Sequence, residues 1–484
     1  DRMIKLSDDI VANRLAANPF LPLYVDIGGG RNDILSDISP AAIARNNAEV
    51  DALLARLDAL DPKTLTDRGQ IRDHAIAREM LEAERGLRIC RSELWTVSHM
   101  EGWPSSFPTL VERQPVATAK DRADALARWG KLPDYIAADI ANLKEGIAKG
   151  YVVPRSVAVR VLAQVEGLIA GTPEASPFYA PARTVDDAAF KTAFAVLVRD
   201  RITPAVRAYR DFLRDTYIPA ARESLSVLDL PNGRACYNAM LRSYTTLDRS
   251  GEDVAALGER TVAANVADVR AIGKKLYGTD DFARIIARVK ADPAERFASK
   301  EEVAAYNREV VARARTAVSA LIDKVPQQPL EVRPMTDAME ASGASSFYMP
   351  AADPAKPALY MLQVGKLENA RRADMAITAV HEGYPGHHLQ FAYAAAQPNS
   401  ALSKIGMNSA YAEGWARYAE RMSEEIGLLN TPQMRISRRA WPARGMVADP
   451  GLHIGKWDRD RLAGYLIETG RFAPDVAGGM IGRI

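Results

Sequence analysis

Amphipathic helical periodicity runs through most of this chain of 484 residues and limits the folds that it can adopt. The clearest segment is SPAAIARNNAEVDALLARLDALDP at residues 39–62. Ser39 can cap the free N–H groups of a helix, and Pro40 fits the first helical position. Apolar side chains then recur at helical spacing until Pro62 ends the pattern. Similar stretches occupy residues 65–91, 119–149, 154–170, 186–216, 250–277 and 300–323.

Strand patterns are rare by comparison. The best is ALYMLQV at residues 358–364, and it follows GASSFYMP at residues 343–350. Both segments are rich in residues that favour strands, so together they predict a hairpin or a small sheet. The sequence therefore predicts a mainly α fold with a small β-sheet directly before residue 370.

Charge and cysteine content exclude several classes of protein. The chain holds 63 basic and 61 acidic residues, and this balance predicts no attraction to nucleic acid or to an anionic membrane. It lacks an apolar run of about 18 residues, so we expect no membrane span. Cys90 and Cys236 are too few for a disulfide scaffold or a cysteine-bound zinc. One bridge between them stays open, but we expect two buried free thiols. The segment after Asp1 has no signal-peptide pattern, so we expect any such peptide to have been removed or never present.

Half of the six histidines fall within eight residues, HEGYPGHH at 381–388. The stretch begins like the zinc-peptidase signature HExxH, in which two His one helical turn apart hold the metal and the Glu acts on its water. Here Pro385 stands where that signature has its second His. We expect residues 369–384 to form the helix that carries His381.

An unbroken helix would not bring a second His to the metal. Since a helix advances about 100° and 1.5 Å per residue, His387 would face about 120° away from His381, and His388 would lie about 10 Å along the axis. Pro385 removes the N–H bond that would close the turn, and Gly386 permits backbone angles that other residues avoid. We therefore expect a bulge or break that swings the following His back. By geometry alone, His387 and His388 are both candidate ligands.

A third ligand should be an acid on a second helix. SAYAEGWARYAERMSEEIG at residues 409–427 predicts such a helix, with Ser409 as its N-cap and Gly427 as its stop. Glu413 lies 26 residues after His387. This length of chain allows one helix to end and a second helix to return antiparallel to it. Two His, one Glu and an open position are typical of a catalytic zinc site. A metal-free, hydrogen-bonded His cluster is the alternative.

Zinc-bound His usually donates its other N–H to a carboxylate or a carbonyl group. Asp374 and Glu420 are the candidates here because each lies seven residues from a ligand. A solvated role is the alternative for both. His74 and His99 have no comparable neighbours in the sequence, so we expect no metal role for them.

Three segments, HEGYPGHHLQ, YAEGWARYAE and DPGLHIGKW, occur in this order between residues 381 and 457. Together they resemble a large bacterial family catalogued as domain of unknown function eight-eight-five, which is grouped with the gluzincin-like zinc metallopeptidases. The resemblance covers nearly the whole chain, including NPFLPLY at 18–24 and RSYTT at 242–246.

The resemblance implies one α-rich domain over residues 1–484, with a deep cleft, a small sheet beside the motif helix, and Zn²⁺ as cofactor. A division into two lobes, 1–330 and 331–484, is an option, and the second lobe would carry the metal. Family members keep the His after Pro-Gly, which favours His387 over His388 as ligand. They also continue past GMIGRI, so we expect part of the cleft wall to be missing or replaced, and residues 251–262 lack a His expected from relatives.

The sequence thus predicts a zinc peptidase with Glu382 as the general base. His453 lies in DPGLHIGKW, where a turn at Pro450 can present it to a cleft as the oxyanion donor, and Tyr348 and Tyr411 are weaker alternatives. We expect the strand at 358–364 to pair with a peptide or small amide substrate. The rivals are a metal-dependent hydrolase of non-peptide amides or esters and a metal-free binding scaffold. We expect a periplasmic or secreted location.

Overall fold

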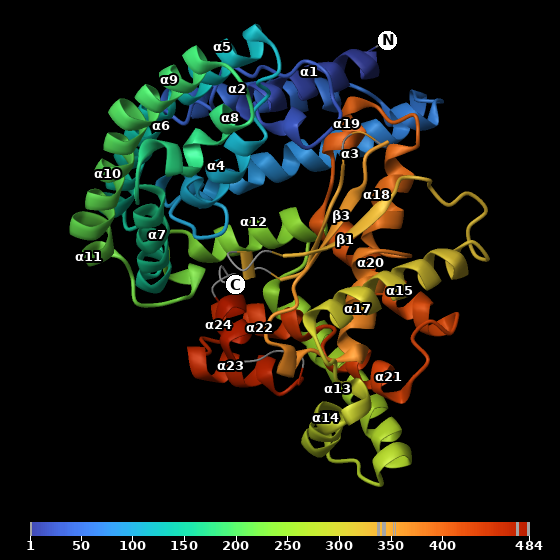
Figure 1. Ribbon diagram of the computed structural model, residues 1–484. Coiled ribbons are helices and arrows are strands. Elements are labelled where there is room, and N and C mark those ends of the chain that lie inside the picture. Colours follow the sequence, from blue (N-terminus) through green and yellow to red (C-terminus); the bar gives the residue numbers. More distant parts are fainter. Residues whose placement is uncertain are drawn as a thin grey trace. The chain divides into compact units, whose positions relative to one another are not determined.

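The structure is a computed structural model that describes residues 2–335, 339–340, 345–351, 353, 355–470 and 474–481, with the backbone alone for 475, 476 and 479. The chain forms two units (Figure 1). Unit 1 is Asp1–Ser243 with Ser400–Gly406, and unit 2 is Tyr244–Asn399 with Met407–Ile484. The sequence-based division between residues 330 and 331 falls inside unit 2.

Unit 1 is helical, and α2 begins as predicted, since Ser39 Oγ accepts a hydrogen bond from the N–H of Ala42 (3.2 Å). The predicted helix at 119–149 is divided in two, because Pro133 lacks an N–H and its ring crowds the preceding turn. The segment 186–216 includes the π-helical turn η7 (Val198–Ile202) and most of a second one, η8 (Leu213–Tyr217). The α-helices are α1 (Arg2–Ala17), α2 (Pro40–Asp58), α3 (Arg68–Leu87), α4 (Trp103–Glu112), α5 (Ala119–Trp129), α6 (Leu132–Lys149), α7 (Arg155–Leu168), α8 (Ala180–Arg183), α9 (Ala188–Leu197), α10 (Thr203–Phe212), α11 (Ile218–Ala220), α12 (Gly233–Thr245) and α19 (Ala401–Ile405).

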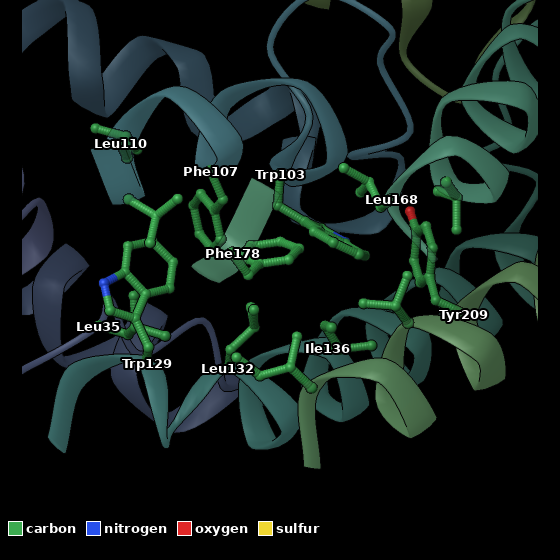
Figure 2. Close-up of a cluster of buried hydrophobic side chains, with 14 of the residues drawn as sticks. Leu35, Trp103, Phe107, Leu110, Trp129, Leu132, Ile136, Leu168, Phe178 and Tyr209 are labelled. Atoms are coloured by element: carbon green, nitrogen blue, oxygen red, sulfur yellow. The ribbon is translucent and has the colours of Figure 1, made fainter. Parts of the chain in front are cut away.

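An aromatic cluster forms the main core of unit 1 (Figure 2). Trp129 is fully buried, and its ring centroid lies 6.2, 6.0 and 6.1 Å from those of Phe20, Phe107 and Phe178. Aromatic side chains bury large apolar areas, and such pairs add further stabilisation through their ring geometry. Unit 1 therefore has a core of its own.

Cys90 and Cys236 form a disulfide bond within unit 1, so the expectation of two free thiols is wrong. The two residues are 146 positions apart in the sequence, and the fold brings their Cα atoms to 4.7 Å. Pairing depends on this Cα separation, which cysteine count and spacing do not reveal.

Unit 2 combines helices with a small sheet. Its second motif helix, α20, is capped by Asn408, whose side chain accepts from the N–H of Tyr411 (3.2 Å), so Ser409 is not the cap. Gly427 follows its end with a φ of 79°, as a helix stop requires. The helices are α13 (Gly251–Tyr277), α14 (Phe282–Ala291), α15 (Lys300–Val318), α17 (Arg372–Glu382), α18 (His387–Ala395), α20 (Ser409–Glu425), α21 (Pro432–Ala440), α22 (Arg444–His453), α23 (Arg459–Ile467) and α24 (Pro474–Ile481).

The sheet has the strand order β1–β3–β2. Its strands are β1 (Leu330–Pro334), β2 (Phe347–Met349) and β3 (Ala358–Leu362). β1 runs parallel to β3, and β2 runs antiparallel to it. The predicted small sheet is confirmed, although residues 343 and 344 lie outside the described residues. Because β3 is the middle strand and is paired on both sides, the expectation that it pairs with a substrate is wrong.

The motif helix α17 is held by packing on its apolar face. Ala373, Ile377 and Val380 are fully buried in the core of unit 2, together with residues of α15 and β3. Small Ala side chains let neighbouring helices approach closely, and α17 packs against α15, α20 and α21. The predicted fold class, mainly α with a small sheet, is confirmed. Within the described ranges, none of the helices has both the length and the apolar character needed to cross a bilayer.

Candidate metal centre

The motif helix is interrupted around Pro385 and Gly386 as the sequence predicts, although it spans Arg372–Glu382 and not the expected residues 369–384. α17 ends at Glu382 and α18 begins at His387. Between them, the N–H of Gly386 donates to the carbonyl of Val380 (3.0 Å). A Cβ atom at Gly386 would lie 1.8 Å from the carbonyl oxygen of His381, so this close approach requires glycine. Trp415 Nε1 donates to the carbonyl of Pro385 (2.9 Å), which ties the break to α20.

The break brings His381 and His387 together. Their ring centroids are 4.8 Å apart, and the rings are nearly perpendicular at 87°. Both Nε2 atoms face the carboxylate of Glu413 on α20, at 3.3 Å for His381 and 3.6 Å for His387. One donor atom from each of these three residues lies within 4.8 Å of the others. These are the three residues predicted as ligands.

The spacing of these atoms is compatible with a shared zinc ion. Zinc bonds of about 2.1 Å in a tetrahedral site place ligand atoms roughly 3.4 Å apart. The N···O distances lie near that value, at 3.3 Å from His381 to Oε2 of Glu413 and 3.6 Å from His387 to Oε1. A charge-assisted N–H···O bond would be shorter, at about 2.7–2.9 Å. The donor set of two imidazoles and one carboxylate is also one that zinc prefers.

Glu420 holds the other nitrogen of His381. Its Oε1 lies 2.9 Å from His381 Nδ1 and also accepts from Arg417 Nη1 (2.6 Å). Burial lowers the pKa of His381, but Glu413 and Glu420 outweigh this effect and raise it to about 9. The contacts with His381 and His387 hold the pKa of Glu413 well below its usual range. Glu413 is therefore a carboxylate at neutral pH.

Asp374 was the other candidate to hold the second ring nitrogen of His381. Its carboxylate does not contact that ring. Its carboxylate instead accepts a hydrogen bond from Ser437 on α21. Arg417 and Trp415 were not predicted to take part in the site. For Arg417 the sequence held a signal, because Arg417 lies three residues before Glu420. Side chains at this spacing meet on a helix, which predicts an ion pair between the two residues.

Glu382 is buried and directly follows His381 in the chain. Burial raises the pKa of its carboxyl above the usual value. Its Oε2 is buried and has no hydrogen-bond partner among the residues that the structure describes. Leaving a buried acceptor without a hydrogen bond costs free energy, so such atoms are rare in folded proteins. Where one occurs, it often marks the place at which a substrate or a water molecule binds.

His388 lies outside the ligand cluster, and both of its ring nitrogens are engaged. Nε2 lies 3.0 Å from the carbonyl oxygen of Gln328, and Nδ1 lies 3.2 Å from the hydroxyl of Tyr348. The ring is fully buried, and this burial lowers its pKa to about 4. His388 is therefore neutral and has no free lone pair for a metal. The hydroxyl of Tyr348 is engaged by the same contact.

The remaining candidates also lie outside the cluster. His453 is buried at the end of α22, with Nε2 3.9 Å from an oxygen of Asp449. Tyr411 is 68% exposed on α20. It precedes Glu413 by two residues, which turns it about 200° away around the helix. His74 and His99 belong to unit 1.

A pocket of about 700 Å³ opens elsewhere in unit 2, between α13 and the C-terminal helices. Its lining includes Val262, Trp457 and Tyr465 but none of the candidate site residues. The deep cleft that the resemblance implies remains a prediction.

Comparison with known proteins places the chain in one family. A family model described as "Bacterial protein of unknown function (DUF885)" matches residues 22–484. No curated protein matches the sequence. A crystal structure of a candidate lipoprotein from Colwellia psychrerythraea has a TM-score of 0.88 and 18% identity, covering 100% of this chain and 89% of that one. A candidate lipoprotein of unknown function from Shewanella oneidensis has a TM-score of 0.77 and 18% identity, covering 99% and 89%. At such identity, the likeness shows the fold alone.

Proposed function

This chain belongs to the bacterial family of unknown function DUF885, and from its site we propose that it is a zinc-dependent peptidase. One observation carries the proposal. Two imidazole nitrogens and a carboxylate converge to within 4.8 Å, and the adjacent buried Glu382 has an oxygen with no partner among the described residues. This combination is typical of metal-assisted hydrolysis.

His381, His387 and Glu413 would hold the zinc ion. Three protein ligands leave one tetrahedral position open, which distinguishes catalytic zinc sites from closed structural ones. When bound there, zinc would supply a Lewis acid that makes water acidic and polarises a carbonyl group.

Glu382 would act as the general base. Its Oε2 would take a proton from the attacking water while the water oxygen bonds to the scissile carbonyl carbon. Glu382 would then give the same proton to the amide nitrogen as the C–N bond breaks. The place of Glu382 next to His381 in the chain supports this role, as does its buried Oε2, which has no hydrogen-bond partner among the described residues.

The oxyanion donor that we propose is His453. Attack on a carbonyl places negative charge on its oxygen, and a positioned donor contributes about 3–4 kcal/mol there. Tyr348 is less suitable because its O–H bonds to His388, and Tyr411 is less suitable because it is exposed.

An edge strand is the place for an extended substrate, since its backbone groups can accept another strand. β2 is one edge of the sheet, and its Tyr348 ring packs against the ring of His387 at 6.4 Å. We therefore assign substrate pairing to β2, in place of the middle strand β3.

An exported location, periplasmic or secreted, fits the molecule best. Disulfide bonds persist mainly in oxidising compartments, and unit 1 has one between Cys90 and Cys236. Both similar structures are described as candidate lipoproteins, which is compatible with export.

The test combines metal analysis with digestion of a peptide library by the purified full chain. We expect one zinc per chain and cleavage that a chelator abolishes and added zinc restores. Glu382→Gln should keep its zinc but lose about 10²–10⁴-fold in turnover, because the base is removed while the ligands remain. Asp374→Asn, on the same helix, is the matched control and should retain activity.

Each alternative function predicts a different result in this experiment. Zinc binding with hydrolysis of esters or small amides but of no peptide would identify a non-peptide hydrolase. A folded protein that binds no zinc would be a metal-free scaffold, and the proposal would be wrong. Full turnover by Glu382→Gln would remove that residue from the mechanism.

A further inference from the structure

The two histidine ligands of the candidate centre are held in different ways. His381 has a charged partner, since Glu420 lies 2.9 Å from its Nδ1. His387 has no carboxylate at its Nδ1 among the described residues. Its Nδ1 is buried and makes no hydrogen bond to any residue in the described part of the chain. Zinc-bound His usually relies on such a bond to fix its ring, so His387 must be fixed by other means.

Aromatic rings surround His387 instead. Tyr348 of β2 stacks on it, with ring centroids 6.4 Å apart and an angle of 29° between the rings. Phe391, one turn further along α18, lies 6.1 Å away. Tyr348 and Phe391 also pack on each other at 5.6 Å. The stack can fix the plane of His387 only if Tyr348 itself cannot rotate or shift.

His388 anchors Tyr348. The carbonyl oxygen of Gln328 can only accept, so His388 Nε2, 3.0 Å away, must carry the hydrogen. In a neutral ring Nδ1 is then the acceptor, and the Tyr348 hydroxyl, 3.2 Å away, donates to it. Tyr384 also packs edge-on against His388, at 4.9 Å and 85°. His388 thus connects Tyr348 to a backbone carbonyl through a fully buried ring.

We propose that His388 is a positioning residue: it locks Tyr348 in the stack that orients His387, in place of the hydrogen bond that His387 lacks. The inference rests on the proposed metal site but goes beyond it, since it assigns a task to the second His of the GHH sequence. It also explains why a buried His sits beside a ligand without binding the metal.

The test measures zinc affinity by competition with a chelator, and the absorption spectrum of the cobalt-substituted protein, which reports ligand geometry without turnover. His388→Ala should still bind one zinc at saturation, but about 10–100-fold more weakly, which is the usual cost of losing a residue that supports a ligand. Its cobalt spectrum should shift. His388→Gln offers an amide N–H to donate and a carbonyl oxygen to accept, so it should recover most of the affinity.

Tyr348→Phe keeps the ring but loses the anchoring hydroxyl, so it should also weaken zinc binding. It provides the test if His388→Ala does not fold. The matched control is Tyr360→Phe, because Tyr360 is the cross-strand partner of Tyr348 and its hydroxyl donates to Asn307 (3.0 Å). That variant should bind zinc like the wild type.

Three results would overturn the inference. Wild-type affinity and an unchanged cobalt spectrum in both His388→Ala and Tyr348→Phe would show that the anchor has no effect. Loss of zinc at saturation in His388→Ala would make His388 a ligand. Equal losses in Tyr348→Phe and Tyr360→Phe would indicate general destabilisation. A wild-type chain without zinc would instead overturn the proposed function itself.

Discussion

At the scale of single residues, the position of a carboxylate decides whether it supports the candidate metal centre. Glu420 is 1% exposed and bonds both His381 and Arg417, whereas Asp374 bonds Ser437. Both acids lie seven residues from a predicted ligand. Seven residues along one helix put Asp374 about 10 Å from His381, too far for a hydrogen bond. Glu420 reaches His381 because α20 packs against α17. The spacing of residues along the sequence does not predict this contact between two helices.

Glu420→Gln should therefore weaken zinc binding by about 10–100-fold, since it keeps the shape of the side chain but removes the charge that orients His381. Asp374→Asn is the control and should bind zinc normally. Chelator competition measures both. Equal affinities in the two variants would contradict the role of Glu420.

Another buried acid, Asp139 of α6, makes stability depend on pH. It is 1% exposed, and burial raises its pKa to about 6 although Thr96 donates a hydrogen bond to it (2.6 Å). Its pKa in the unfolded chain is about 3.9, so the folded state binds the proton more tightly. The contribution of Asp139 to stability is complete below about pH 4 and is lost as the pH rises through about 6.

That loss amounts to about 2–3 kcal/mol by pH 7, at roughly 1.4 kcal/mol for each unit of pKa shift. Asp139→Asn cannot ionise, so its stability relative to the wild type should increase between pH 4 and pH 7. Thermal unfolding of both proteins across this range provides the measurement. A difference that stays constant with pH would show that Asp139 does not titrate in this window.

At the scale of elements, the break between α17 and α18 is the feature on which the site depends. The sequence predicts it, because Pro385 and Gly386 have well-defined effects on a helix. Gly386→Ala would force a Cβ atom against the carbonyl of His381, a backbone contact that cannot move aside. We expect a stability loss of about 1–3 kcal/mol from overpacking, and a much weaker zinc affinity because His387 is displaced.

Gly414→Ala is the matched control on α20. A Cβ atom there would meet nothing within 4 Å, so the change should stabilise the helix by about 0.5–1 kcal/mol and leave zinc binding intact. Unfolding by denaturant and zinc titration test the two variants side by side. Normal zinc affinity in Gly386→Ala would show that the break does not set the position of His387.

Local patterns account for most elements that the sequence predicts correctly. Ser39 and Pro40 start α2, and Gly427 ends α20, because caps and stops act within one helical turn. β1 was missed: its five residues end in proline, and its partner β3 follows more than twenty residues later. The role of Gln328 was also missed, since a backbone carbonyl carries no sequence signal.

At the scale of the whole molecule, long-range pairing is what the sequence fails to show, and the disulfide is the clearest case. Cys90 and Cys236 both belong to unit 1, whereas the three candidate ligands belong to unit 2. Reduction, or replacement of both cysteines by alanine, should destabilise unit 1 by about 2–5 kcal/mol.

Zinc affinity should be unchanged in the same samples, because no candidate ligand lies in the unit that the disulfide closes. Thermal unfolding with and without reductant gives the first quantity, and chelator competition gives the second. A loss of zinc binding that parallels reduction would contradict this independence.

The zinc content of His387→Ala tests the central claim most directly, because this residue reaches the site only through the break in the motif helix. The measurement is elemental analysis of dialysed wild-type, His387→Ala and His388→Gln proteins, each shown to be folded. We predict one zinc per chain in the wild type and in His388→Gln, and almost none in His387→Ala. A folded His387→Ala protein that keeps its zinc, or a wild-type chain that binds none, would contradict the account.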